Sequence, residues 1–181
     1  MNDDRVSALQ KLESATEDRL LKPVMIDKLL QSNGRCFLAV VRPENLAHLV
    51  KLGMQFFALN STKLSIVAGD RIVLYKSKDG SATKTAGIVG TFKVIGNPYS
   101  NNQRLFARGF STHIPWVPTL LALEHPLPFA FLVPQLRFII NKQNYGSALQ
   151  GTLKRLPDED YNLIEAALAN HIDSLKPETT A

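Results

Sequence analysis

The sequence of 181 residues predicts an α+β fold in which helices surround a small, bent β-sheet. Two observations lead to this prediction: a pair of strands joined in a hairpin, and apolar runs of helical or strand length on both sides of that hairpin. The hairpin comprises residues 71–76 and 85–95, which are rich in β-branched and aromatic residues, with Asp79 and Gly80 in a polar turn between them.

Two glycines in the second strand of the hairpin indicate where the sheet bends. Gly87 and Gly90 weaken a strand that other residues would stabilise better, so we expect a bulge, a sharp bend or the close approach of another backbone. Residues 88–95 alternate in a way that predicts one face on a core and one face only partly covered. Bends of this kind close small barrels.

Further elements follow from apolar runs and from the residues that begin or end helices. The strand that follows Pro115 and contains Pro118 is confined to an edge or a bulge, because proline cannot donate a hydrogen bond to a neighbouring strand. In chain order, we expect a central strand at 35–41, a helix at 43–53, strands at 54–59 and 116–125, a helical turn and a strand within 127–140, a loop at 141–156, and a last helix that begins at Pro157 and packs through Tyr161, Ile164, Leu168 and Ile172.

The chain divides into an extension, a domain and a tail. Residues 1–34 are interpreted as an N-terminal helical extension with a break near Lys22 and Pro23, residues 35–175 as the domain, and residues 176–181 as a C-terminal tail. The apolar stripes of the extension exceed what a free tail needs. We therefore expect it to cover the domain or to form a homodimer contact.

Cysteine content and hydropathy indicate the compartment. Cys36 is the single cysteine, which excludes a disulfide framework and a cysteine-based zinc site and suits a reducing environment. Because Cys36 lies in an apolar run, we interpret it as a small buried hydrophobe rather than a nucleophile. With no signal peptide and no run of membrane-spanning length, the sequence predicts a cytoplasmic protein without a membrane partner.

The positive charge belongs to the middle of the chain. Residues 35–156 carry 15 basic and 4 acidic side chains, whereas the segments on both sides are net acidic. A domain this basic attracts polyanions, of which phosphate backbones are the commonest, so the predicted partner is a nucleic acid. The alternative is that solubilising lysines are spread evenly over the surface.

Catalytic signatures are missing from the sequence. It contains no glycine-rich phosphate loop, no pair of metal ligands at the usual spacing and no nucleophile elbow. The four histidines are scattered without a carboxylate at a suggestive spacing. We therefore expect a protein that is not an enzyme and has no cofactor or metal.

The order of the elements resembles the EVE domains of the PUA-like superfamily. The motifs are PEN after the first strand, GDRIVLY, AGIVGTFKVIGNPY and LRFIINKQNYGSALQGTLKRLPDEDYNLI, and the likeness runs from about residue 36 to residue 168. EVE domains are small open barrels with helices around them and are close to the YTH domains, which bind RNA carrying a methylated adenine. The resemblance implies a PUA-like open β-barrel with a base-binding pocket.

The resemblance also implies which residues form this pocket. Phe56 matches the first aromatic wall and Tyr145 the second, where relatives usually have tryptophan. Asn45 matches an asparagine that hydrogen-bonds the base edge in the YTH readers. The chain departs from the pattern because tryptophan is absent from both walls and Val41 stands where a polar residue is expected.

A base-binding pocket has physical requirements of its own. A base needs flat apolar walls, on which it gains about 1–3 kcal/mol per aromatic, and a hydrogen-bonding group at its edge. Phe57 alternates away from Phe56 and is expected in the core, while Trp116 is counted with the pocket residues as a lid or a packing residue rather than a wall. The expected phosphate-binding rim consists of cations at strand ends and loops: Arg42, Lys76, Lys142, Lys154 and Arg155.

The sequence therefore predicts a nucleic-acid-binding module that recognises a modified base in DNA or RNA. The alternative is a non-enzymatic module that binds a protein or a small molecule and has a vestigial base pocket. A basic rim around an open aromatic pocket favours the first function, and an acidic or filled pocket favours the second.

Overall fold

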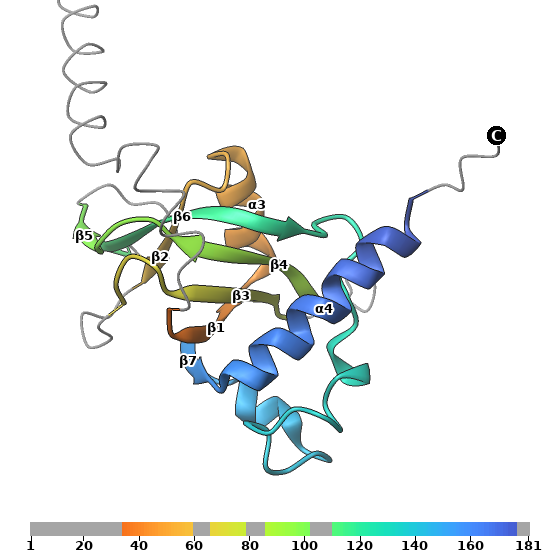
Figure 1. Cartoon of the computed structure of the whole chain (residues 1–181). Coiled ribbons are helices and arrows are strands. Elements are labelled where there is room, and N and C mark those ends of the chain that lie inside the picture. The colour runs from red at the N-terminus through yellow and green to blue at the C-terminus, as the bar shows by residue number, and fades with distance from the viewer. Residues whose placement is uncertain (1–33, 60–65, 79–85, 102–109, 177–181) are drawn as a thin grey trace, which may run out of the picture.

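The computed structural model describes residues 34–59, 66–78, 86–101 and 110–176 (Figure 1). The predicted N-terminal extension, apart from Gly34, lies outside the described residues, and so does the homodimer contact expected from it. The turn at Asp79 and Gly80 and the tail beyond Lys176 also lie outside them.

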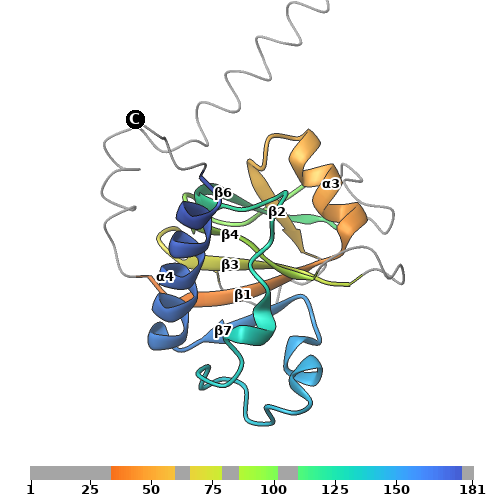
Figure 2. The ribbon, with the colours of Figure 1, turned by 90° about the vertical axis from the view of Figure 1, so that its right-hand side faces the viewer.

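One mixed sheet curls into a half-barrel with a helix on each side (Figures 1 and 2). The strand order is β2-β6-β4-β3-β1-β7, with the short β5 also paired to β6, and only β1 and β3 are parallel among these pairs. The elements are β1 (Cys36–Val41), α3 (Pro43–Lys51), β2 (Phe56–Leu59), β3 (Arg71–Lys76), β4 (Gly87–Val94), β5 (Tyr99–Ser100), β6 (Thr112–Leu121), the 3-10 turns η1 (Phe129–Phe131) and η2 (Tyr145–Leu149), β7 (Leu153–Leu156) and α4 (Asp158–Ser174). Neither described α-helix is long and apolar enough to cross a membrane.

Each face of the sheet has its own hydrophobic core. Phe37, Ala39 and Val41 of β1 point into the first core, which α3 covers with Leu46 and Leu49. The alternate residues of β1 point into a second core, which α4 covers with its buried stripe Tyr161, Ile164 and Leu168. The predicted central strand and both of these helices are therefore confirmed.

The two glycines of β4 mark both a bulge and a close approach, as expected. The register between β3 and β4 shifts at Leu74, which leaves Val89 without an opposite residue. A Cβ atom on Gly87 would lie 2.4 Å from the Leu127 carbonyl oxygen, so only glycine fits there. The prediction of a partly covered face is wrong: every residue of β4 is buried, because both faces of the sheet carry a core.

Pro118 of β6 lies beside a bulge. β2 pairs with residues 112–115 of β6 and β4 with residues 116–121, so β4 is the one described strand next to Pro118, as expected for an edge. The register of β6 against β4 shifts between Thr91 and Phe92, next to Pro118. There Thr91 Oγ1 and Thr119 Oγ1 share a hydrogen bond of 2.8 Å.

Two predictions for residues 127–156 are wrong. Residues 134–140 form turns rather than a strand, because their backbone has another partner: the buried Asp160 carboxylate accepts hydrogen bonds from the N–H groups of Arg137 at 2.8 Å and Phe138 at 2.7 Å. The expected loop contains a strand, since Leu153–Leu156 pairs with β1 as β7. Lys154 and Arg155 therefore belong to a strand and not to a loop.

Candidate functional site

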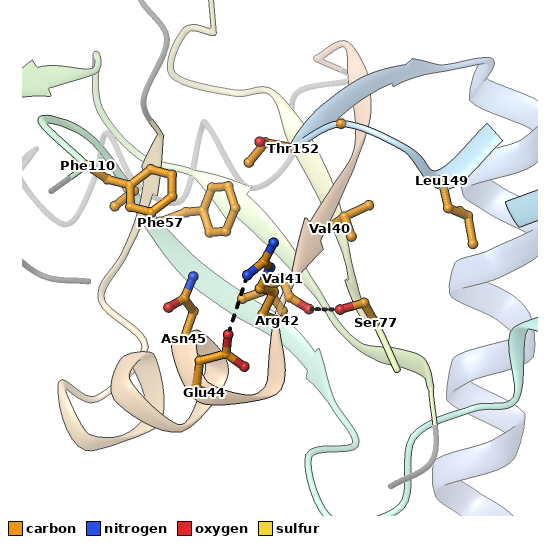
Figure 3. A pocket seen from close by; sticks show the side chains of 12 residues that line it. Val40, Val41, Arg42, Glu44, Asn45, Phe57, Ser77, Phe110, Leu149 and Thr152 are labelled. Atoms are coloured by element: carbon orange, nitrogen blue, oxygen red, sulfur yellow. Dashed lines mark hydrogen bonds and ion pairs between the residues drawn. The ribbon is translucent and has the colours of Figure 1, made fainter. Parts of the chain in front are cut away.

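A cleft of about 420 Å³ lies where the half-barrel fails to close, between the two end strands of the sheet (Figure 3). β2 forms one side of it, and the segment just before β7 forms the other. The end of β1 and the first turn of α3 lie between them. The lining residues are Val40, Val41, Arg42, Glu44, Asn45, Phe57, Ala58, Ser77, Phe110, Leu149, Gly151 and Thr152.

The walls of the cleft are apolar. In Figure 3, Phe57 and Phe110 lie toward one side and Val40 and Leu149 toward the other. Phe57 is only 2% exposed, so it presents little more than part of its ring to the cleft. Trp116 stacks on the Phe57 ring with centroids 5.2 Å apart and thereby fixes the orientation of this wall.

The polar groups of the cleft come chiefly from the start of α3. Pro43 begins this helix, because its fixed backbone angle suits the first helical position, and Glu44 and Asn45 follow in the first turn. Arg42 Nη1 lies 4.0 Å from Glu44 Oε1, and the two side chains are 68% and 64% exposed. Ser77 Oγ donates a hydrogen bond of 3.3 Å to the Val41 carbonyl oxygen.

Of the four residues predicted for the base pocket, only Asn45 lines this cleft. Phe56 projects from the opposite face of β2, where its ring stacks on His113 with centroids 4.8 Å apart. Tyr145 packs in η2 near Phe129, with a centroid distance of 6.1 Å. The structure thus does not bring Phe56 and Tyr145 together in the cleft.

Trp116 has a packing role. Its side chain is 1% exposed, its ring stacks on Phe92 at 4.0 Å, and its indole N–H donates a hydrogen bond of 2.7 Å to the Met54 carbonyl oxygen. With both faces and the N–H group engaged, Trp116 supports the wall formed by Phe57 and does not itself line the cleft.

The aromatic residues that do line the cleft were missed by sequence reasoning. Phe57 had been expected in the core only, and it both belongs to the first core and reaches the cleft. Phe110 was not considered. The one signal for it was that Phe106 and Phe110 are the two aromatic residues in the largely polar stretch between β5 and β6.

The residues predicted to form the phosphate-binding rim do not lie together around the cleft. Arg42 lines the cleft, and Lys76 adjoins Ser77, which also lines it. The Lys142 ammonium donates a hydrogen bond to the Leu136 carbonyl oxygen. Lys154 and Arg155 lie on β7, and the Arg155 guanidinium stands 5.5 Å from the centroid of Phe37, toward the other end of β1 from Arg42.

Two chemically reactive side chains, those of Cys36 and His113, are buried outside the cleft. Burial, reinforced by a hydrogen bond with Asp158, raises the pKa of the Cys36 thiol to about 12, so this cysteine is a poor nucleophile. Burial lowers the pKa of His113 below its ordinary value, while a hydrogen bond with the Phe110 backbone acts in the opposite direction. Neither residue lines the cleft.

Comparison with known proteins identifies relatives of both the sequence and the fold. No family model matches the chain. A UPF0310 protein of Pyrococcus abyssi is 31% identical over 118 residues, which cover 60% of this chain and 80% of the relative. A UPF0310 protein of Pyrococcus horikoshii is 31% identical over 116 residues, with 60% and 79% coverage.

Solved structures with the same fold have little sequence identity. The Mmi1 YTH domain superposes with a TM-score of 0.53 at 10% identity, covering 78% of each chain, and the same domain in complex with RNA has a TM-score of 0.52 at 10% identity, covering 78% of this chain and 81% of that one. A hypothetical protein from Leishmania major has a TM-score of 0.51 at 12% identity, covering 77% of this chain and 98% of that one. These likenesses confirm the predicted α+β, PUA-like fold.

Proposed function

Because the chain belongs to the UPF0310 family and has the PUA-like fold of YTH domains, we propose that it is a non-enzymatic module that binds single-stranded nucleic acid and holds one base in the cleft. The observation that carries the proposal is the cleft itself, which combines aromatic walls with hydrogen-bonding groups at the start of α3. The Mmi1 YTH domain solved in complex with RNA supports it as an example of this fold with such a partner.

The dimensions and walls of the cleft suit a base. Its volume of about 420 Å³ falls within the range of roughly 300–1,000 Å³ found for small-molecule sites. A base entering between Phe110 and Leu149 would gain about 1–3 kcal/mol from stacking on an aromatic ring. The Asn45 amide both donates and accepts hydrogen bonds, so it can pair with a base edge.

The same lining would favour a base that carries an added methyl group. Val40, Val41 and Ala58 contribute apolar surface next to the polar groups of the cleft. A methyl group that leaves water for such a surface gains roughly 0.8 kcal/mol. Recognition of a methylated base in RNA or DNA is therefore part of the proposal, and affinities for methylated and unmethylated oligonucleotides of one sequence would test it.

A small molecule is the second candidate ligand, because the electrostatic character of the rim is mixed. Arg42 is accompanied by Glu44, and no lysine among the described residues lines the cleft. Free nucleosides that bind as tightly as oligonucleotides containing the same base would favour this candidate.

The decisive experiment compares two phenylalanines. Labelled single-stranded RNA and DNA are titrated with the whole chain and with its variants. We expect Phe110→Ala and Asn45→Ala each to weaken binding by about 5- to 150-fold, the equivalent of losing one stacked or paired base. Phe131→Ala is the matched control, because Phe131 is 74% exposed and lies outside the cleft lining. Unfolding measurements on the same variants separate lost affinity from lost stability. Equal affinities of the Phe110→Ala and Phe131→Ala proteins would overturn the proposal.

A further inference from the structure

An acidic side chain is an unexpected part of a cleft that is proposed to bind a polyanion. Glu44 lines the cleft from the first turn of α3, beside Arg42 (Figure 3). The separation of 4.0 Å between Arg42 Nη1 and Glu44 Oε1 is too long for a hydrogen bond, so both carboxylate oxygens keep their capacity to accept one. An ion pair this exposed contributes little to stability, and a ligand can replace it.

The polar groups around Glu44 have distinct hydrogen-bonding capacities. A glutamate side chain accepts only and an arginine side chain donates only. The Ser77 hydroxyl already donates its hydrogen to the Val41 carbonyl oxygen. The two neighbours Arg42 and Glu44 therefore present a set of donors next to a pair of acceptors at one place in the cleft.

We propose that Glu44 makes the cleft selective for guanine, an inference that rests on the proposed binding of a base there. The Watson–Crick edge of guanine carries two adjacent donors, N1–H and the N2 amino group, followed by the acceptor O6. The two oxygens of the Glu44 carboxylate accept the two donors, and the Arg42 guanidinium donates to O6. Such charge-assisted, bidentate pairs are the strong hydrogen bonds of recognition sites.

The other bases lack two adjacent donors followed by an acceptor. Adenine places the acceptor N1 beside its amino group. Cytosine presents its amino group at one end of the edge, next to the acceptors N3 and O2, and uracil presents a single N–H group flanked by acceptors. An acceptor facing Glu44 would leave one carboxylate oxygen without a partner and bring lone pairs together, which weakens the binding of a wrong base. Each bidentate pair of this kind discriminates against a wrong base by about tenfold or more.

The test uses single-stranded RNA nonamers of uridine with guanosine, inosine, adenosine or cytidine at the centre. We expect the whole chain to bind the guanosine oligonucleotide about tenfold or more tightly than the adenosine one. Inosine, which keeps N1–H and O6 but lacks the N2 amino group, should bind with intermediate affinity. In Glu44→Gln, one acceptor and the charge are lost, so the preference for guanosine should shrink to about threefold or less.

Glu124→Gln is the control variant, since it removes the same charge from an exposed position outside the cleft lining and should keep the preference. If Glu44→Gln strengthens binding to all four oligonucleotides equally, Glu44 only repels phosphates and the inference is wrong. Equal binding of all four by the unaltered chain also contradicts the inference while the proposed function stands. If none of the four oligonucleotides binds, both the inference and the proposed function are overturned.

Discussion

His113 is a buried histidine that stays neutral in the folded protein. It is 1% exposed, stacks on Phe56, and meets the Tyr99 ring edge-on at 5.4 Å. Its Nε2 atom has no hydrogen-bond partner among the described residues. A second proton on the ring would place a charge between aromatic rings, and burial therefore lowers the pKa of His113.

The buried state of His113 predicts a pH dependence of stability. Because the folded pKa lies below the unfolded value of 6.5, the unfolded state binds more protons, and the contribution of His113 is fully present above pH 6.5 and is lost as the pH falls below it. His113→Phe should therefore lose less free energy of unfolding between pH 7 and pH 5 than the parent, as measured by urea titration. His125→Gln, at an exposed position, is the control. Parallel pH profiles of His113→Phe and the parent would contradict the assignment.

A single buried carboxylate holds the turns at 134–140 against α4. Asp160 is 2% exposed in the first turn of α4 and accepts two backbone N–H groups from the preceding segment, which fixes the turns at 134–140 against the helix. The neighbouring Glu159 is exposed and lies 3.6 Å from Arg137. Two adjacent acidic residues at the start of one helix are thus expected to contribute very differently to stability.

Replacing these acids should show the difference. Asp160→Ala leaves two buried N–H groups without acceptors and should lower the free energy of unfolding by about 2–4 kcal/mol. Glu159→Ala removes only an exposed ion pair and should change it by less than about 1 kcal/mol. Denaturant titrations of both variants provide the measurement, and equal losses would mean that the carboxylate of Asp160 does not hold the segment.

These elements also show what the sequence alone could predict. β1, α3, the β3–β4 pair and α4 follow from local signals, namely apolar runs, terminal proline and glycine, and strand composition. The turns at 134–140 could not be predicted, because Asp160 supplies their hydrogen bonds from 22 or 23 residues away. In the site, the sequence predicted Asn45 and Arg42, which line the cleft, but it predicted Phe56 as a wall where the structure has Phe57. Alternation separates these two side chains, but it does not say which face borders the cleft when both faces are covered.

At the scale of the whole molecule, the excess of positive charge is only partly available to a ligand. Arg35 pairs with the buried Asp70 at 2.8 Å, and Arg71 pairs with Asp158 at 3.6 Å while its guanidinium lies 4.4 Å from the Tyr161 ring centroid. These arginines join β1, β3 and α4 to one another. We therefore expect fewer phosphate contacts than the net charge alone suggests.

The salt dependence of binding measures this number of contacts. Each phosphate neutralised in a single strand contributes a slope of about −0.7 to the logarithm of affinity against the logarithm of salt concentration. Removing the charge of Lys76, which adjoins the cleft residue Ser77, in Lys76→Gln should make the slope shallower by about 0.7. Arg137→Gln, at an exposed position outside the cleft, should leave the slope unchanged. An affinity that does not vary with salt would exclude phosphate contacts altogether.

The claim that a base occupies the cleft is tested most directly by titrating the isotope-labelled chain with a single-stranded oligonucleotide and following its amide resonances. The side-chain amide of Asn45 and the backbone amides of Ser77 and Thr152 come from three separate segments that meet only at the cleft. We predict that their resonances shift together and saturate at one ligand per chain. Shifts confined to residues outside the cleft, such as the exposed Phe131 and Ile140, would contradict the account.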